Sequence, residues 1–510
     1  MDDEQHNPAS LPPAAAAQTI VALSRTTNHV HLVAGTHHTA YIDNETGAVY
    51  SFGGGEAAPS SEAEDGRWQQ QEAGFRPRED TNQFREQQML HHLGHGVEVG
   101  SCVMRPRRIA GLDGIFIAEI STGPVHMLFL ARGGVDLYAC GDGAHGKLGC
   151  GDTKSHATPR RLDLFDQTLH KGDCVIQISA GECHSMAVSE QGWVYSWGSG
   201  VNGLHGHEEA DNQWWPRPIL QLETRVAYGA SAGPSHSLVW TNIGELWAWG
   251  SGGSGQLGIG EVPRDFQRRQ PMLIEPLDGI PIRLACAGDR YSIAITMSGD
   301  LYSFGLGIHG RLGHSTRSDC FTPIRVEALA DEPALFACAG FDHTVVLTDR
   351  GHVFTFGRDA HGKLGRGGRV KHMLPKDMDN VLEASCVAAG ALHHVADAKS
   401  DVLSLYAFGR NASTVFGHKQ DVAVGHAADT TLLGPTRVEA LVEGDMAVKE
   451  VTEVAVGRNH TVVRIKTVKG ARVEFRAFGS NERGQLGLSS LLENHLEKSV
   501  PTRVAEPEEG

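Results

Sequence analysis

Short apolar segments separated by turn residues recur along the whole chain, and none shows the 3.6-residue apolar spacing of an amphipathic helix. A representative stretch has apolar-rich segments at 185–188 and 194–197, with Glu190-Gln191-Gly192 between them. Glycine at such a place permits the positive φ that a tight hairpin turn requires. The pattern therefore predicts an all-β protein made of antiparallel hairpins.

Four motifs recur in a constant order and divide the chain into eight units. The first is Gly-x-x-His, which ends at His38, His126, His184, His236, Tyr291 (the one substitution), His343, His393 and His460. The second is aromatic-x-x-Gly, which ends at Gly53, Gly141, Gly198, Gly250, Gly305, Gly357, Gly409 and Gly479. A Gly-x-Leu-Gly step follows in most units, and each unit then closes with a proline three residues before an apolar residue, at Pro106, Pro159, Pro216, Pro271, Pro323, Pro375, Pro435 and Pro501.

Each unit contains the strand-forming segments of one four-stranded blade. Proline cannot donate to a sheet ladder, so we expect it at the start of an outer edge strand. A single blade of this size cannot bury both of its faces, whereas blades stacked in a ring cover each other and leave only short edges. A solenoid is the competing repeat architecture, and the strand and turn signals favour a closed β-propeller of four-stranded blades.

The ordered motifs resemble the repeat of the regulator-of-chromosome-condensation family, and the resemblance covers about residues 30–504. Tryptophan-aspartate and kelch propellers fit less well. The family usually closes seven blades, whereas eight units are counted here, and we favour the count. The division we expect is an N-terminal tail at 1–29, a propeller at 30–504 interrupted by a disordered insertion at 55–90, and an acidic end at 505–510.

Composition narrows the possible partners. The 62 glycines suit many tight turns, and the net charge of −16 disfavours direct binding to nucleic acid. Nine cysteines are scattered without Cys-x-x-Cys spacing, which indicates reduced thiols rather than a metal or redox site. The acidic first residues and the lack of a long apolar run predict a protein of the cytoplasm or nucleus with no membrane span.

No motif indicates catalysis or a cofactor. The chain has neither a phosphate-binding Gly-x-x-x-x-Gly-Lys-Ser/Thr nor a nucleophile elbow, and its paired histidines lack further zinc ligands. We interpret the repeated histidine as a structural residue that hydrogen-bonds backbone within its own blade. The prediction is a non-catalytic binding protein.

The two variable residues of each Gly-x-x-His motif are the first candidates for partner binding, because loops on a rigid frame commonly carry function. The candidates here are Glu182, Asp289, Arg290, Phe341 and Asp342. The founding member of the family is an exchange factor for the small GTPase Ran, and the resemblance implies that Asp289 and Asp342 contribute to exchange. The chain departs from that member because it lacks the enlarged wedge loop and a basic N-terminal tail, and it lacks the Gly-Trp-Arg-His repeats of the family's plant ultraviolet receptors.

Two further features are specific to this chain. Trp214-Trp215 precedes Pro216 in an acidic loop and is either an aromatic anchor in a protein interface or packed against the neighbouring blade. The insertion 55–90 carries eight acids and four arginines and is interpreted as an inert loop. Our primary prediction is a protein-interaction scaffold that uses the Gly-x-x-His loops, and the alternative is a guanine-nucleotide exchange factor for a Ran-like small GTPase.

Overall fold

The computed structural model describes residues 32–34, 38–54, 93–96, 103–162, 173–260, 267–359 and 364, then nine strands between 372 and 503 with residues 457 and 504. The expected N-terminal tail at 1–29, the insertion at 55–90 and the acidic end at 505–510 lie outside the described residues. Within the described part, no helix is long and apolar enough to cross a membrane.

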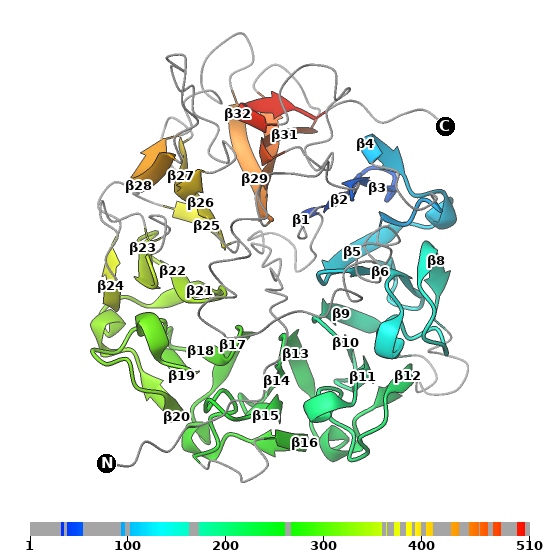
Figure 1. Cartoon of the computed structure of the whole chain (residues 1–510). Coiled ribbons are helices and arrows are strands. Elements are labelled where there is room, and N and C mark those ends of the chain that lie inside the picture. Colours follow the sequence, from blue (N-terminus) through cyan, green and yellow to red (C-terminus); the bar gives the residue numbers. More distant parts are fainter. Residues whose placement is uncertain are drawn as a thin grey trace, which may run out of the picture.

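Eight four-stranded antiparallel sheets stand in a ring around a common centre (Figure 1). Each sheet consists of four consecutive strands, ordered from the centre of the ring to its outer rim. We number these sheets as blades 1 to 8, from β1–β4 to β29–β32. The predicted all-β propeller is confirmed, and the count of eight units gives eight blades.

The strands occupy equivalent places in every blade. The inner strands are β1 (Leu32–Ala34), β5 (Ile117–Thr122), β9 (Val175–Ala180), β13 (Ala227–Ala232), β17 (Ile282–Ala287), β21 (Ala334–Ala339), β25 (Ala384–Ala389) and β29 (Val448–Val456). The second strands are β2 (His38–Ile42), β6 (His126–Ala131), β10 (His184–Ser189), β14 (His236–Thr241), β18 (Tyr291–Thr296), β22 (His343–Thr348), β26 (His393–Ala398) and β30 (His460–Thr467).

The third strands are β3 (Val49–Gly53), β7 (Leu137–Gly141), β11 (Val194–Gly198), β15 (Leu246–Ser251), β19 (Leu301–Gly305), β23 (Val353–Gly357), β27 (Ser404–Asn411) and β31 (Val473–Ser480). The outer strands are β4 (Val103–Arg108), β8 (His156–Arg161), β12 (Gln213–Pro218), β16 (Gln267–Leu273), β20 (Cys320–Arg325), β24 (His372–Asp377), β28 (Thr430–Arg437) and β32 (Glu497–Arg503). Single 3₁₀ turns lie between third and outer strands at η4 (Ala144–Gly146), η5 (Val201–Gly203) and η8 (Ile308–Gly310), and after outer strands at η3 (Ala110–Leu112), η6 (Leu220–Leu222), η7 (Glu275–Leu277) and η9 (Glu327–Leu329).

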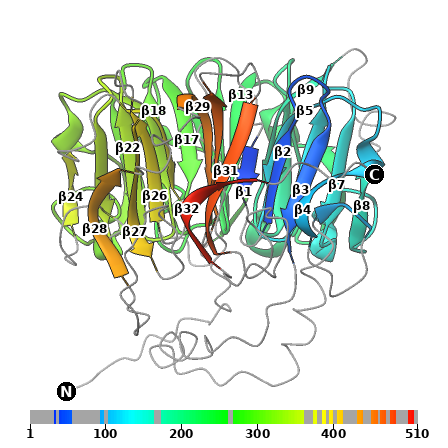
Figure 2. The same ribbon diagram turned by 90° about the horizontal axis from the view of Figure 1, so that it is seen from above.

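The antiparallel order divides the connections between two faces of the ring (Figure 2). Connections from first to second and from third to fourth strands lie on one face, which we call the loop face because it carries the Gly-x-x-His motifs. Hairpin turns from second to third strands lie on the opposite face, which we call the turn face. The chain therefore gathers its most variable connections on one side.

The hydrophobic core lies between neighbouring blades rather than inside any one of them. One cluster joins Leu128 and Leu130 of blade 2 to Tyr195 and Trp197 of blade 3, and another joins blades 4, 5 and 6. Trp197 and Trp249 are fully buried. Burial of apolar area stabilises the fold by roughly 25 cal/mol per Å², and here that area becomes buried only when adjacent blades associate.

Neighbouring blades are also joined by backbone hydrogen bonds on the turn face. In six blades, the carbonyl of a turn glycine accepts a hydrogen bond from the backbone N–H of the first residue of the next blade's inner strand. An example is Ala227 N–H to Gly192 O at 3.0 Å. Gly192 has a φ of +88°, and a Cβ there would lie 2.5 Å from the Cα of Val226. Glycine is needed at this turn for its conformation and for the close approach of the next blade.

The closing proline stands inside the outer strand rather than at its start, which corrects the prediction. In blade 3 the register of β11 on β12 pairs Ser196 with Arg217 and Gly198 with Gln213, so it shifts at the point where Pro216 stands. A register shift leaves one backbone N–H without a ladder partner, and proline lacks that N–H. The repeat therefore places its proline at a bulge.

The ring is closed between blades 8 and 1 without an exchanged strand among the described residues, because every sheet contains only consecutive strands. Leu32, Tyr41 and Phe52 of blade 1 share a hydrophobic cluster with Ala455 and Val462 of blade 8. A hydrogen bond of 3.0 Å joins His460 Nε2 to Thr39 Oγ1. Closure uses the same side-chain contacts as the other junctions.

Candidate functional site on the loop face

Among the described residues, the repeated histidines of blades 1 to 4 and of blade 8 each form a hydrogen bond to a hydroxyl of the next blade, and we call this set of bonds the histidine ladder. His126 Nε2 lies 3.0 Å from Ser185 Oγ, and the equivalent bonds join His184 to Ser237 at 2.8 Å and His236 to Ser292 at 2.7 Å. In these three cases the hydroxyl belongs to the residue directly after the next blade's Gly-x-x-His motif. The histidine is structural, as predicted, but its hydrogen-bond partner is a side chain of the neighbouring blade, which corrects the expected bond to backbone within its own blade.

The same hydroxyls bind the Gly-x-Leu-Gly step of the preceding blade. Ser185 Oγ donates to the carbonyl of Lys147 at 2.8 Å, and Ser237 Oγ donates to that of Leu204 at 3.0 Å. The buried indole N–H of Trp197 donates to the Lys147 carbonyl as well, at 2.9 Å. Hydrogen bonds to one backbone carbonyl therefore link three of the four recurrent motifs at such a junction.

Burial keeps the ladder histidines neutral. It lowers the pKa of His126, His184 and His236 to about 3 and that of His460 to about 4. A neutral imidazole buried between two blades donates or accepts one hydrogen bond but is inaccessible to substrate. This environment suits packing rather than general acid or base chemistry.

Blade 5 departs from the ladder because Tyr291 takes the histidine position. Its hydroxyl donates to the carbonyl of His343 at 2.6 Å and lies 3.3 Å from Thr344 Oγ1. The Tyr291 side chain is longer than that of histidine, so its hydroxyl extends beyond Thr344 Oγ1, the group that a histidine would contact, and bonds to the backbone of blade 6. Burial raises the pKa of the Tyr291 hydroxyl, so it stays protonated and able to donate.

A charged group has assembled around this junction. The guanidinium of Arg311 lies 5.6 Å from the centre of the Tyr291 ring, a cation–π contact, and donates to the carbonyls of Ile308 at 3.2 Å and Phe341 at 2.8 Å. Arg311 is only 3% exposed, so it supports the loop that carries Phe341 rather than facing solvent. Arg311 occupies the variable position of Gly-x-Leu-Gly in blade 5.

The loop residues of blades 5 and 6 differ in their exposure. Phe341 is 39% exposed, whereas Asp342 beside it is 2% exposed, with Oδ1 3.2 Å from His343 Nδ1 and Oδ2 3.6 Å from Arg358 Nη1. Arg290 is exposed and Asp289 half-buried. Burial raises the pKa of Asp289, against the opposing effect of Arg290 and Arg311. A partner on the loop face would meet Phe341, Arg290 and Arg358, with Asp342 beneath them.

The variable position of Gly-x-Leu-Gly, which Arg311 occupies in blade 5, is Lys147 in blade 2. Its ammonium group forms a buried ion pair with Asp142 at 2.5 Å. Although burial opposes it, this pair lowers the pKa of Asp142. Glu182 lies half-buried on the adjacent loop of blade 3, away from the group at blades 5 and 6. The structure thus brings together four of the predicted residues, namely Asp289, Arg290, Phe341 and Asp342, and leaves Glu182 apart.

Trp214 and Trp215 lie on outer strand β12, where the structure confirms packing against the neighbouring blade, while a role as an interface anchor stays a prediction. Their rings pack on Gly146 and Gly151 of blade 2, yet they remain 48% and 45% exposed. Sequence reasoning missed Arg311 and Arg358 as members of the group near Tyr291. The available signal was the coincidence, in one unit, of a substituted histidine position and a charged Gly-x-Leu-Gly residue.

Comparison with known proteins gives the same fold. The RCC1-like domain family matches residues 86–463. The ultraviolet-B receptor UVR8 of Arabidopsis thaliana is 30% identical over 384 residues, which cover 75% of this chain and 81% of the receptor. The human E3 ubiquitin-protein ligase HERC2 is 29% identical over 335 residues, 64% of this chain but only 7% of the ligase.

A solved structure of yeast RCC1 (Prp20) bound to Kap60 superposes with a TM-score of 0.55 at 22% identity, covering 72% of this chain and 84% of that one. A likeness at this identity supports the propeller fold and nothing more specific. The family match over most of the chain, together with the ordered motifs and the blade geometry, shows that this chain belongs to the RCC1-like domain family.

Proposed function

We propose that this chain is a protein-interaction platform whose loop face binds another protein at Phe341, Arg290 and Arg358. The observation that carries the proposal is the exposed aromatic ring of Phe341, held in place by a buried guanidinium at the one described junction that lacks the ladder histidine. Partly exposed aromatic and arginine side chains on a preorganised surface are the residues that most often dominate binding energy at protein interfaces.

The charges suggest the kind of contact. Arg290 makes no ion pair among the described residues, and Arg358 has a side chain that is 45% exposed. Two cations beside a hydrophobic ring suit a partner that presents an apolar side chain with a nearby carboxylate. The platform needs no catalytic group, and we place its encounter with the partner in the cytoplasm or nucleus.

The test compares partner capture by the parent protein and by Phe341→Ala with Arg290→Ala, followed by measurement of Kd with the purified partner. We expect the double variant to weaken binding by at least about tenfold, since aromatic and arginine anchors each contribute roughly 1 kcal/mol or more. Tyr228→Ala is the control, because it removes a 63% exposed ring from the inner strand β13. Unchanged affinity in the double variant would reject the loop-face platform.

A guanine-nucleotide exchange factor for a Ran-like GTPase is the second candidate, and the partly exposed carboxyl of Asp289 on the same face supports it. Its test is the rate of nucleotide release from the GTPase with parent protein, Asp289→Ala and Asp342→Ala. Asp342 is buried against His343, so the Asp289 variant is the cleaner probe of direct contact. Exchange requires acceleration by the parent that Asp289→Ala diminishes, and no acceleration by the parent would remove this candidate.

A further inference from the structure

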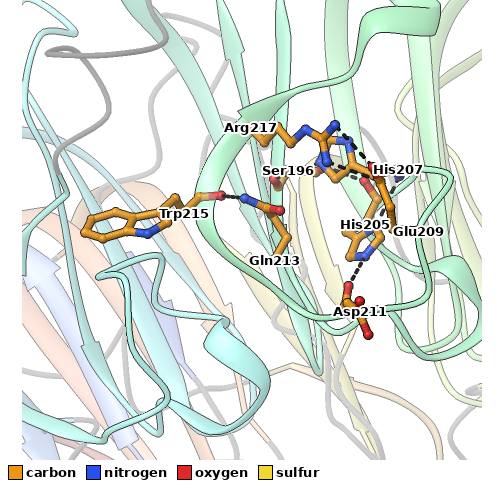
Figure 3. Close-up of polar contacts among 8 residues, drawn as sticks. All are labelled: Ser196, His205, His207, Glu209, Asp211, Gln213, Trp215 and Arg217. Atoms are coloured by element: carbon orange, nitrogen blue, oxygen red, sulfur yellow. Dashed lines mark hydrogen bonds and ion pairs between the residues drawn. The ribbon is translucent and has the colours of Figure 1, made fainter.

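A second surface stands apart from the Phe341 site, where Trp214 and Trp215 begin outer strand β12 of blade 3. About half of each side chain faces solvent, although indoles are rarely left exposed without a role. Figure 3 shows Trp215 extending away from the neighbouring polar residues, with its carbonyl accepting a hydrogen bond from Gln213 Nε2 at 3.0 Å. The pair therefore forms an exposed aromatic surface on the rim of the ring.

The pair is held rigidly. A Cβ on Gly151 would lie 1.9 Å from the Cζ2 atom of Trp215, and one on Gly146 would lie 2.7 Å from Cδ1 of Trp214, so both rings rest directly on backbone of blade 2. Gly151 N–H also donates to the Trp214 carbonyl at 3.0 Å. Because the rings are fixed before any partner arrives, binding to them costs little side-chain entropy.

The fold does not need tryptophan at these two positions. The residues two and one before the outer-strand proline are Ala157 and Thr158 in blade 2 and Phe321 and Thr322 in blade 5. The methyl groups of Thr158 and Thr322 lie against Gly96 and Gly260 of the preceding blade, as the ring of Trp215 lies against Gly151. Smaller residues therefore meet the packing requirement, and the second large ring is surplus to it.

The loop that leads into β12 is acidic and ordered. Glu208, Glu209 and Asp211 are exposed, and Glu209 pairs with Arg217 at 3.1 Å. The carbonyl of Asp211 lies 2.8 Å from His205 Nε2, which holds the loop against the blade (Figure 3). Burial lowers the pKa of both His205 and His207, so these rings add no positive charge at neutral pH.

The charge balance beside the tryptophans is therefore negative. Glu208 and Asp211 make no ion pair among the described residues, which leaves two carboxylates available to a ligand. The basic residue of this side of blade 3 is Arg217, and its guanidinium is paired with Glu209. Indole faces attract ammonium and guanidinium groups, and the carboxylates add to that attraction.

We propose that Trp214 and Trp215, together with Glu208 and Asp211, form a docking surface for a basic segment of another protein. An arginine or lysine of that segment lies over an exposed indole face while its neighbours approach the carboxylates. The proposal does not depend on the Phe341 site, which lies on blades 5 and 6 (Figure 1) and exposes the cations Arg290 and Arg358.

The test measures the affinity of a fluorescently labelled arginine- and lysine-rich peptide by anisotropy, with the full chain. The informative variant is Trp214→Ala with Trp215→Thr, which installs the residues that blade 2 has at these positions and leaves the charge unchanged. We expect it to weaken binding by about tenfold, because cation–π contacts at partly desolvated sites are lost. General attraction of the peptide to a chain of net charge −16 is identical in parent and variant.

Two further measurements complete the test. Glu208→Gln with Asp211→Asn should weaken binding about threefold and flatten its dependence on salt, whereas Phe321→Ala in blade 5 should leave the affinity unchanged. An acidic peptide and a single-stranded oligonucleotide should not bind the tryptophan surface. Equal affinity of the basic peptide for parent and Trp214→Ala/Trp215→Thr, or tighter tryptophan-dependent binding of the oligonucleotide, would overturn the proposal.

Discussion

The junction between blades 3 and 4 and the junction between blades 5 and 6 solve the same packing problem in two ways. In the first, His184 bonds to Ser237 across the interface, both groups are fully buried, and no charged loop residue takes part. In the second, Tyr291 spans the interface, and Arg311 stacks on its ring and bonds to the loop of Phe341.

The difference teaches where specificity is located in a repeat protein. The repeated histidine junctions stabilise the ring, and they bury the recurrent imidazole so that no partner reaches it. At the junction of blades 5 and 6, Arg311 lies against the ring of Tyr291 and bonds to the carbonyl of Phe341, which fixes the adjacent loop. The substituted repeat is thus the place where the loop face acquires an aromatic and two arginines that solvent reaches.

The two kinds of junction should differ most in their response to acid. A histidine whose pKa is about 3 or 4 when folded and about 6.5 when unfolded binds its proton only in the unfolded chain over the interval between, so stability falls as pH decreases below 6.5. At pH 5, protonation of one such histidine in the unfolded chain lowers the free energy of unfolding by about 2 kcal/mol. The four histidines together, His126, His184, His236 and His460, lower it by roughly 8 kcal/mol.

That loss is comparable with the whole stability of a domain, so we expect the chain to unfold near pH 5. Tyr291 does not titrate in this range and adds nothing to the loss. Urea denaturation from pH 8 to pH 5 measures the effect, and a midpoint that does not move over that interval would show that the histidines are not buried neutral residues.

Breaking a single histidine junction should have the next largest effect. His184→Ala removes a buried ring and leaves the Ser237 hydroxyl with one partner fewer, which we expect to cost about 3 kcal/mol. His184→Gln keeps a hydrogen-bonding group and should cost less, and it also removes one proton from the acid transition. Equal losses for both variants would mean that packing alone, without the hydrogen bond, holds this junction.

Removing only the hydroxyl at the other junction should cost about 1 kcal/mol. Tyr291→Phe loses the hydrogen bond to the His343 carbonyl but retains the ring beneath Arg311. Thermal unfolding together with binding of the partner separates the two roles: stability should fall slightly while affinity at Phe341 is retained. A large loss of affinity in this variant would place the hydroxyl, rather than the ring and Arg311, in control of the loop.

The smallest effect is expected at the surface ion pair of Arg217 with Glu209. Both side chains are substantially exposed, so Arg217→Ala should change the free energy of unfolding by less than about 0.5 kcal/mol. Chemical denaturation at low and high salt measures it. A loss as large as that of His184→Ala would contradict the view that stability lies between the blades rather than on the rim.

Particular residues show how far sequence reasoning extends. The turn glycines, the apolar segments and the fixed motif order predicted strands, blades and a ring, because these features depend on spacing along the chain. Pro216 was predicted at the start of its strand but lies three positions inside it, since a bulge depends on how two strands register. Trp214 and Trp215 left two interpretations open; the structure confirms packing on blade 2, and the interface role stays a prediction that their exposure leaves open.

The chain's own pattern determined that there are eight sheet-forming units and that a histidine recurs as a structural residue, because turn conformation and strand periodicity are local properties. Only the tertiary structure decided that this histidine serves the neighbouring blade, that Asp342 is covered while Phe341 is open, and that Arg311 joins them. Those contacts join residues tens of positions apart, and their geometry exists only once the blades have packed against one another.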